Sequence, residues 1–150
     1  LQQPALLSFL MDLQMVLEGV PYIEIETNGS IMPDPDLDNG IAQYNVSPKL
    51  ANSGMPLEKR CVEDVMFWFS STENAIFKFV VAKQEDVVEM KTTFVVPYSI
   101  MYDRIYLMPA ADTQSQLQTL SPEIVEWCKE DGFRFSSRLQ VQIWDRCVGV

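Results

Sequence analysis

The sequence of 150 residues predicts an α/β fold with a mainly parallel sheet. Segments with the period of a helix alternate along the chain with segments rich in β-formers. One segment, 75–82 (AIFKFVVA), is almost continuously apolar, which is typical of a strand buried on both faces of a parallel sheet. The hydrophobic content of 47% is enough for a packed core, and the length fits one domain or part of one.

The first half of the chain predicts two helices and two strands. A helix is expected from Pro4 to Gly19, because leucines recur there every three or four positions, with proline in the first turn and glycine at the end. Strands are expected at 22–26, which turn residues follow, and at 41–46, which ends before Ser47 and Pro48. The remaining segments are a loop over 32–40, an irregular stretch over 49–57 and a helix over 58–71.

The second half repeats the alternation. The apolar segment 75–82 is the clearest strand, and a helix starts at 85–90. A strand at 105–108 ends at Pro109, and a long helix from Thr113 to Asp131 ends before Gly132. The last predicted strand covers 133–143. The predicted order is therefore α-β-β-α-β-α-β-α-β, without an internal repeat or a linker.

Composition excludes several classes of function. The chain has 21 acidic and 11 basic residues, a formal net charge of −10 and no histidine. Nucleic-acid binding is therefore not expected, and a Ser-His-Asp triad or a histidine-ligated zinc is excluded. Cys61, Cys128 and Cys147 fit no compact metal-ligand spacing, and their odd number favours a reducing, cytoplasmic compartment. No apolar run is long enough to cross a membrane, so no membrane partner is expected.

Candidate binding residues follow the predicted strands. Ligands of parallel α/β sheets bind beyond the carboxyl ends of the strands. The residues at these ends are Glu26, Thr27, Asn28, Gly29, Ser47, Pro48, Lys49, Lys83, Gln84, Met108, Pro109 and Ala110. They suit hydrogen bonding to a ribose, an amino-acid head group or a carboxylate, although an ordinary loop and a strand terminator explain the same residues.

Other residues support weaker interpretations. Asp34, Asp36 and Asp38 alternate as in a calcium loop, but the glycine and the closing glutamate are not in place. Lys78 either faces a ligand or pairs with a carboxylate, and the aromatic run 67–69 is expected in the core. Cys128 is expected to be buried.

Five segments together resemble the 7-carboxy-7-deazaguanine synthase (QueE) family of radical S-adenosylmethionine enzymes. They are 26–29 (ETNG), 46–50 (VSPKL), 77–81 (FKFVV), 106–110 (YLMPA) and 138–144 (RLQVQIW). The first residues, LQQ, resemble those that follow the Gly-Gly-Glu-Pro motif of the family. The resemblance covers essentially the whole chain.

The resemblance implies an incomplete (β/α) barrel that binds S-adenosylmethionine, a [4Fe-4S] cluster and Mg²⁺. It implies a carbon–nitrogen lyase of queuosine biosynthesis that converts 6-carboxy-5,6,7,8-tetrahydropterin to 7-carboxy-7-deazaguanine, started by a 5′-deoxyadenosyl radical. A pterin substrate and a homodimer follow from the same resemblance. The matching positions imply eight cofactor-binding residues, which are Ser47, Pro48, Lys49, Glu26, Thr27, Asn28, Met108 and Pro109. Val150, near Gly149, is implied to bind the substrate.

The sequence also departs from the family. The close triplet of cysteines, the Gly-Gly-Glu-Pro motif and the magnesium ligand are absent, and Gln140 stands where many members have histidine. Residues 1–150 are therefore expected to be the C-terminal portion of a single radical S-adenosylmethionine barrel domain, inactive alone and without catalytic or metal-binding residues of its own. Three alternatives remain open: a different radical S-adenosylmethionine enzyme, a non-catalytic nucleoside-binding module and a small flavodoxin-like protein.

Overall fold

The five strands of the chain form one parallel sheet. The computed structural model describes residues 3–17, 21–38 and 40–147. The strands are β1 (Glu24–Thr27), β2 (Gln43–Val46), β3 (Ala75–Val81), β4 (Ile105–Pro109) and β5 (Arg134–Phe135). They lie in the order β1-β2-β3-β4-β5, and each neighbouring pair is parallel. This confirms the predicted α/β class and its mainly parallel sheet.

Helices connect these strands. The α-helices are α1 (Gln3–Val16), α2 (Pro35–Asp38), α3 (Leu57–Arg60), α4 (Glu63–Ser71), α5 (Gln84–Met90), α6 (Gln114–Asp131) and α7 (Leu139–Trp144). Shorter segments are η1 (Ala51–Ser53), the π-helical η2 (Lys91–Val95) and η3 (Tyr102–Arg104). Helix α6 begins after Thr113, whose Oγ1 accepts a hydrogen bond from the Gln116 N–H, and ends at the left-handed Gly132, as its sequence predicts.

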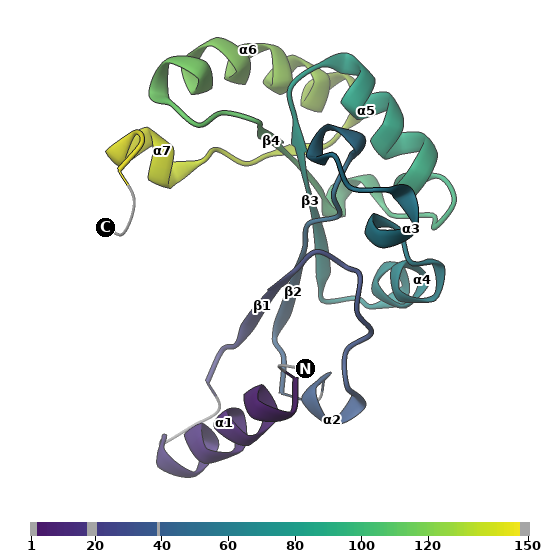
Figure 1. Cartoon of the computed structure of the whole chain (residues 1–150), viewed down its shortest axis with the longest axis vertical. Coiled ribbons are helices and arrows are strands. Elements are labelled where there is room, and N and C mark those ends of the chain that lie inside the picture. Colours follow the sequence, from purple (N-terminus) through teal and green to yellow (C-terminus); the bar gives the residue numbers. More distant parts are fainter. Residues whose placement is uncertain (1–2, 18–20, 39, 148–150) are drawn as a thin grey trace.

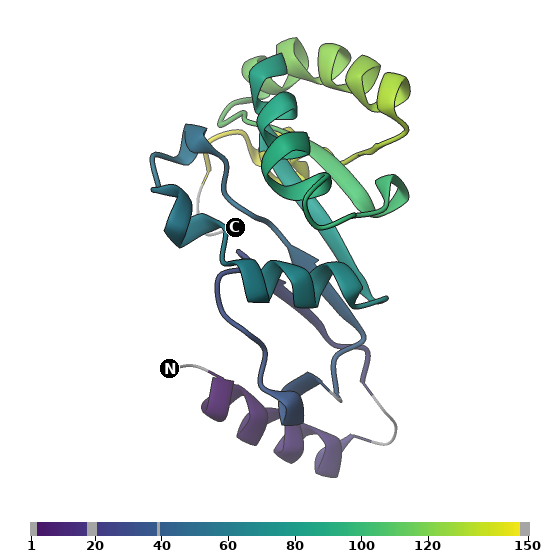
Figure 2. The ribbon, with the colours of Figure 1, turned by 90° about the vertical axis from the view of Figure 1, so that its right-hand side faces the viewer.

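The helices α4, α5 and α6 cover one face of the sheet, and α1 lies beneath the amino ends of β1 and β2 (Figure 1; Figure 2). Strand β3 alternates strictly between the covered face and the other face. Phe77 and Phe79 are fully buried under the helices, whereas Ile76 and Lys78 on the other face are only half-buried. The prediction that this strand is buried on both faces is therefore wrong. Among the described residues, no helix covers the second face of the sheet in the way that α4, α5 and α6 cover the first. We call this second face the open face.

The strand order discriminates between parallel folds. In a flavodoxin-like protein the order reverses near its middle, which places helices on both faces. Here each strand follows its predecessor without reversal, and right-handed crossovers in such a sheet put the connecting helices on one side, as in a (β/α) barrel. The flavodoxin-like alternative is therefore wrong. The sheet is consistent with part of a radical S-adenosylmethionine barrel.

Several predicted boundaries differ from the structure. The expected strand 133–143 pairs only over β5, and most of its remainder forms α7. The expected helix 58–71 is interrupted at Cys61 and Val62. Helix α2 lies wholly within the expected loop 32–40, and α3 begins at Leu57, the last residue of the stretch expected to be irregular. Helix α1 ends at Val16, and the predicted stop at Gly19 lies outside the described residues. Within 67–69, Phe69 is buried but Phe67 is 66% exposed, so its predicted place in the core is wrong.

Tyr44, on the covered face, makes the stability of the fold decrease as the pH rises in the alkaline range. Its ring lies edge-on to Trp68 and Phe69, and its hydroxyl donates a hydrogen bond of 3.0 Å to Asp38 Oδ1. Burial, and then the Asp38 carboxylate, raise the pKa of Tyr44 well above its ordinary value. The protonated phenol therefore stabilises the fold below about pH 10, and this contribution is lost as the pH rises through the folded-state pKa.

We expect Tyr44→Phe to reduce the loss of stability between about pH 9 and 11, measured by urea unfolding at several pH values. Burial and the contact with Cys61 raise the pKa of Tyr98 as well, so the slope should fall rather than vanish. Tyr22→Phe, at an exposed position, is the control. An unchanged alkaline slope in Tyr44→Phe would contradict this account.

No helix in the described part of the chain is long and apolar enough to cross a membrane.

Candidate functional site

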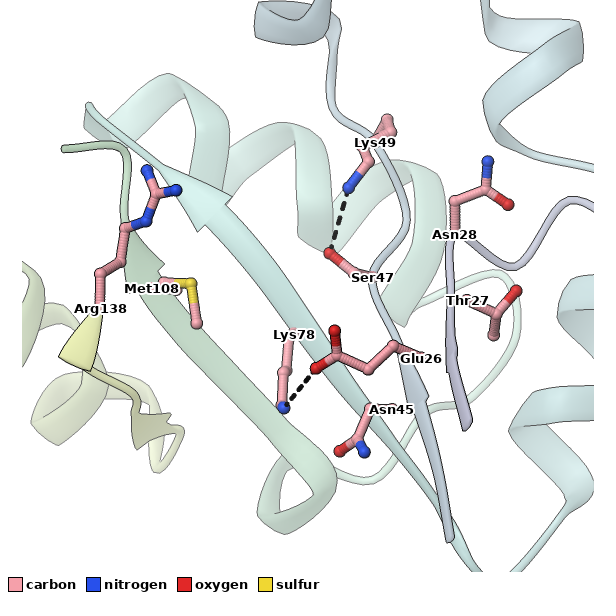
Figure 3. Close-up of a pocket in the computed structure, with 9 residues that line it drawn as sticks. All are labelled: Glu26, Thr27, Asn28, Asn45, Ser47, Lys49, Lys78, Met108 and Arg138. Carbon is pink, nitrogen blue, oxygen red and sulfur yellow. Dashed lines mark hydrogen bonds and ion pairs between the residues drawn. The ribbon is translucent and has the colours of Figure 1, made fainter. Parts of the chain in front are cut away.

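A pocket of about 410 Å³ opens near the carboxyl ends of the strands (Figure 3). Its lining residues are Glu26, Thr27, Asn28, Asn45, Ser47, Lys49, Lys78, Met108 and Arg138. They come from β1, β2, β3 and β4, from the loops that follow β1 and β2, and from the segment that precedes α7. The position agrees with the general location of ligands in parallel α/β sheets.

The turn after β1 holds Thr27 and Asn28 in place. Thr27 Oγ1 accepts a hydrogen bond from the Gly29 N–H at 3.1 Å. Asn28 Oδ1 accepts hydrogen bonds from the N–H and the hydroxyl of Ser30. Gly29 has φ +72°, a left-handed conformation that glycine adopts without steric cost. Because the Asn28 oxygen is engaged within the turn, its amide NH₂ is the group left to meet a ligand.

The loop after β2 carries Ser47 and Lys49. The Ser47 N–H continues the ladder by donating to Thr27 O at 2.7 Å, and Lys49 Nζ lies 3.4 Å from Ser47 Oγ. Arg60, which is 8% exposed, donates from Nη1 to Lys49 O and pairs with Glu89 at 2.6 Å. This buried arginine therefore fixes the backbone of the loop at Lys49 without lining the pocket itself.

Asn45 and Lys78 line the pocket on the open face below these loops. Asn45 is 3% exposed and donates from Nδ2 to Glu24 Oε2 at 2.7 Å. Lys78 Nζ lies 3.6 Å from Glu26 Oε1, so the lysine both faces the pocket and pairs with a carboxylate. Asn45 was not among the predicted residues. The alternation of side chains along a strand could have identified it. Asn45 is two residues before Ser47, so both side chains lie on the same face, and Asn45 pairs with Glu26 in the register of β2 against β1.

Met108 and Arg138 line the pocket on its β4 side (Figure 3). The Arg138 guanidinium donates from Nη1 to Ala111 O at 2.8 Å and to Asp112 Oδ1 at 3.1 Å. Arg138 belongs to the segment 138–144 that resembles the family, and the resemblance assigns no role to it. Its position is fixed by the turn between β5 and α7, which sequence periodicity does not predict.

Six of the eight predicted cofactor-binding residues lie together in the pocket, which are Glu26, Thr27, Asn28, Ser47, Lys49 and Met108. Pro48 and Pro109 are buried beside them and do not line it. Lys83 lies in a different pocket near α5. Val150, the predicted substrate-binding residue, and Gly149 lie outside the described residues.

The lining is cationic although the chain is acidic. It contains three basic side chains and one carboxylate, whereas the whole chain has a net charge of −10. Hydroxyl, amide and ammonium groups at one end of a sheet suit a polar ligand that carries an anionic group.

The three cysteines lie in different parts of the described structure. Cys61 is half-buried, Cys147 is exposed, and Cys128 is buried with its pKa raised by desolvation. No group of three histidine, cysteine or acidic side chains in the described residues is arranged to hold a metal ion, and this includes Asp34, Asp36 and Asp38.

The chain is similar to curated proteins named 7-carboxy-7-deazaguanine synthase. It is 34% identical over 142 residues to the one from Pyrobaculum aerophilum, a match that covers 93% of this chain and 60% of the relative. It is 26% identical over 144 residues to the one from Halobacterium salinarum, which covers 83% of this chain and 54% of the relative. The chain thus spans little more than half the length of these relatives. No family model and no solved structure matches it.

Proposed function

We propose that the chain is the cofactor-binding portion of a 7-carboxy-7-deazaguanine synthase, and that its pocket binds S-adenosylmethionine. The relatives' names support the type of enzyme. The observation that carries the binding site is the meeting of Glu26, Asn28, Ser47 and Lys49 in one pocket at the carboxyl ends of β1 and β2.

The pocket residues bind and orient in this proposal. Lys49 and Ser47 together offer an ammonium and a hydroxyl to a carboxylate or a hydroxyl of the cofactor. Glu26 offers a carboxylate to the ribose hydroxyls or the amino group, and Lys78 Nζ lies 3.6 Å from this carboxylate. When bound, and given one electron from a [4Fe-4S] cluster held outside this chain, S-adenosylmethionine would supply the radical for the ring contraction of the carboxylated tetrahydropterin, while the residues of the pocket would bind and orient it.

The [4Fe-4S] cluster and Mg²⁺ do not fit the described residues. A cluster needs several thiolates close together, whereas Cys61, Cys128 and Cys147 lie in different elements and form no common group. In the proposal these ligands come from residues outside this chain, which alone is inactive. The pterin substrate, a homodimer and a cytoplasmic location belong to the same proposal.

Calorimetric titration of the chain with S-adenosylmethionine tests the proposal. We expect saturable binding, weakened about tenfold or more by Lys49→Ala and by Ser47→Ala, because each removes a charged or hydroxyl partner of the ligand. Lys59→Ala is the matched control, since Lys59 is an exposed lysine outside the pocket. Absence of binding, or an equal effect of Lys59→Ala and Lys49→Ala, would show that this pocket is not the cofactor site.

A further inference from the structure

We propose that Arg138 binds a carboxylate group of the ligand at the junction of two pockets. It lines the pocket described above and also a second pocket of about 490 Å³. The second pocket is lined by Asp112, Arg138, Gln140, Val141, Asp145, Arg146 and Cys147. Among the described residues no other lines both pockets, so a ligand that extends from one pocket to the other passes this guanidinium.

The hydrogen bonds of Arg138 leave one edge of the guanidinium available. Both protein acceptors, Ala111 O and Asp112 Oδ1, bind Nη1. Within the described part of the chain, Nε and Nη2 have no hydrogen-bond partner. The Nε–H and one Nη2–H point the same way and form the fork that binds the two oxygens of a carboxylate. Arg138 is thus held through one nitrogen and open along the edge suited to bidentate recognition.

The surrounding charges favour an anion at this edge. Lys78 pairs with Glu26 at 3.6 Å, but Glu26 is 82% exposed, so the pair offsets only part of the charge of Lys78. The other positive charges of the first pocket lie on Lys49 and Arg138. These two side chains lie on opposite sides of the pocket (Figure 3). Asp112 offsets part of the charge of Arg138, but it is 87% exposed and therefore well solvated. Lysine acts as a point charge, whereas the arginine fork distinguishes a planar carboxylate from other groups.

Arg134 provides a matched comparison. It is the first residue of β5, and its side chain is exposed. Its Nη1, however, donates to the Tyr106 hydroxyl at 2.9 Å, and its guanidinium stacks on that ring. It lines neither pocket. Replacing it removes one positive charge from the same region without touching the proposed binding edge.

This inference rests on the proposed function. If that function holds, the carboxylate that Arg138 binds comes from one of two sources. One is the amino-acid part of S-adenosylmethionine, and the other is the carboxyl group of a pterin. Two pairs of probes separate them: S-adenosylmethionine against its decarboxylated form, and pterin-6-carboxylate against pterin. In each pair the ligands differ by the carboxylate that Arg138 would bind.

Calorimetric titration of the chain with these four probes tests the assignment. We expect the carboxylated member of one pair to bind about 10- to 100-fold more tightly to the wild type, because a charge-assisted bidentate contact is lost in the other member. Arg138→Gln should bring this ratio close to one, and Arg138→Lys should lower it in part. Arg134→Gln should leave it unchanged. Since Arg138 also anchors Ala111, thermal melts verify that each variant keeps the fold.

Each outcome decides the assignment. If the probes bind but both ratios are the same in Arg138→Gln as in the wild type, Arg138 does not read a carboxylate, whereas the proposed function stands. If none of the four probes binds, the proposed function fails, and NMR of the Arg138 Nε–H with sodium acetate decides separately. A shift with acetate that sodium chloride does not reproduce supports the assignment, and no shift overturns it.

Discussion

Arg104→Met should lower the free energy of unfolding by about 3–5 kcal/mol, the largest single effect expected in this chain. The guanidinium donates to four carbonyl oxygens at 2.6–3.1 Å, those of Phe69, Ser70, Thr72 and Ala75. It therefore ties the last turn of α4 to the first residue of β3. Methionine fills similar space but leaves these carbonyl groups without their charged donor.

Burial lowers the pKa of Arg104 from its ordinary value, but arginine stays charged at any pH at which the chain folds. The effect should therefore be independent of pH across the neutral range. Urea unfolding measures it, with Arg134→Met as the control, because the guanidinium of the exposed Arg134 makes one hydrogen bond within the described part of the chain, to the Tyr106 hydroxyl, and stacks on that ring. We expect the control to cost about 1 kcal/mol or less. Equal costs for the two variants would refute the role given to Arg104.

Gly29→Ala should destabilise the chain by about 2–4 kcal/mol and should also weaken the binding of S-adenosylmethionine. The residue has φ +72°, and a Cβ built there would lie 2.9 Å from Val46 Cγ1 and 3.4 Å from Met66 Sδ. Both neighbours are fully buried, so neither can move away cheaply. Because Gly29 follows Asn28 in the turn, a shift of this backbone also displaces a pocket residue.

Gly54→Ala separates conformational strain from crowding. Gly54 has nearly the same φ, +74°, but a Cβ there would have no atom within 4 Å. We expect it to cost about 1–2 kcal/mol, the penalty of the left-handed conformation alone, and to leave the ligand affinity unchanged. Thermal and urea unfolding, together with the same calorimetric titration, measure both effects. If the two alanine variants are equally stable, the close approach of Val46 to Gly29 has no energetic importance.

Sequence periodicity predicted the elements whose signals agree with their packing. The long helix α6 has a threonine cap, an apolar stripe that includes Leu117 and Ile124, and a terminal glycine. Strands β3 and β4 are rich in residues that favour strands and are bounded by turn residues. Local preference and burial point the same way in these segments, so the sequence was sufficient.

Helix α7 shows where periodicity fails. In the segment LQVQIW the apolar residues alternate with glutamine, which predicts a strand. A strand needs a partner, however, and pairing with β4 ends at Phe135. Helix α7 instead buries only Val141, against Ala111 and Leu117, and Gln114 Nε2 donates to Gln142 O. Tertiary context decided this segment, and no local signal reports it.

Some residues of the candidate site could likewise be predicted from the sequence, whereas others could not. Residues at the ends of β1 and β2 were predictable, because parallel strands bring their carboxyl ends to one edge. Asn45 required the register of β2 against β1, and Arg138 required the path of the chain after β5. The roles of the prolines were not predictable from the motif alone, because a chain neighbour of a lining residue points to the opposite face.

The strands of this sheet lie side by side in the same order as they follow one another in the sequence, β1-β2-β3-β4-β5. Every strand pairs only with the strands before and after it in the sequence, and no connection has to cross another. Such a sheet grows by accretion, since each new βα unit needs only the edge left by the previous one. A parallel strand could therefore be added beside β1 without disturbing any hydrogen bond between β1 and β5, which is the topological condition for assembling one barrel from successive pieces.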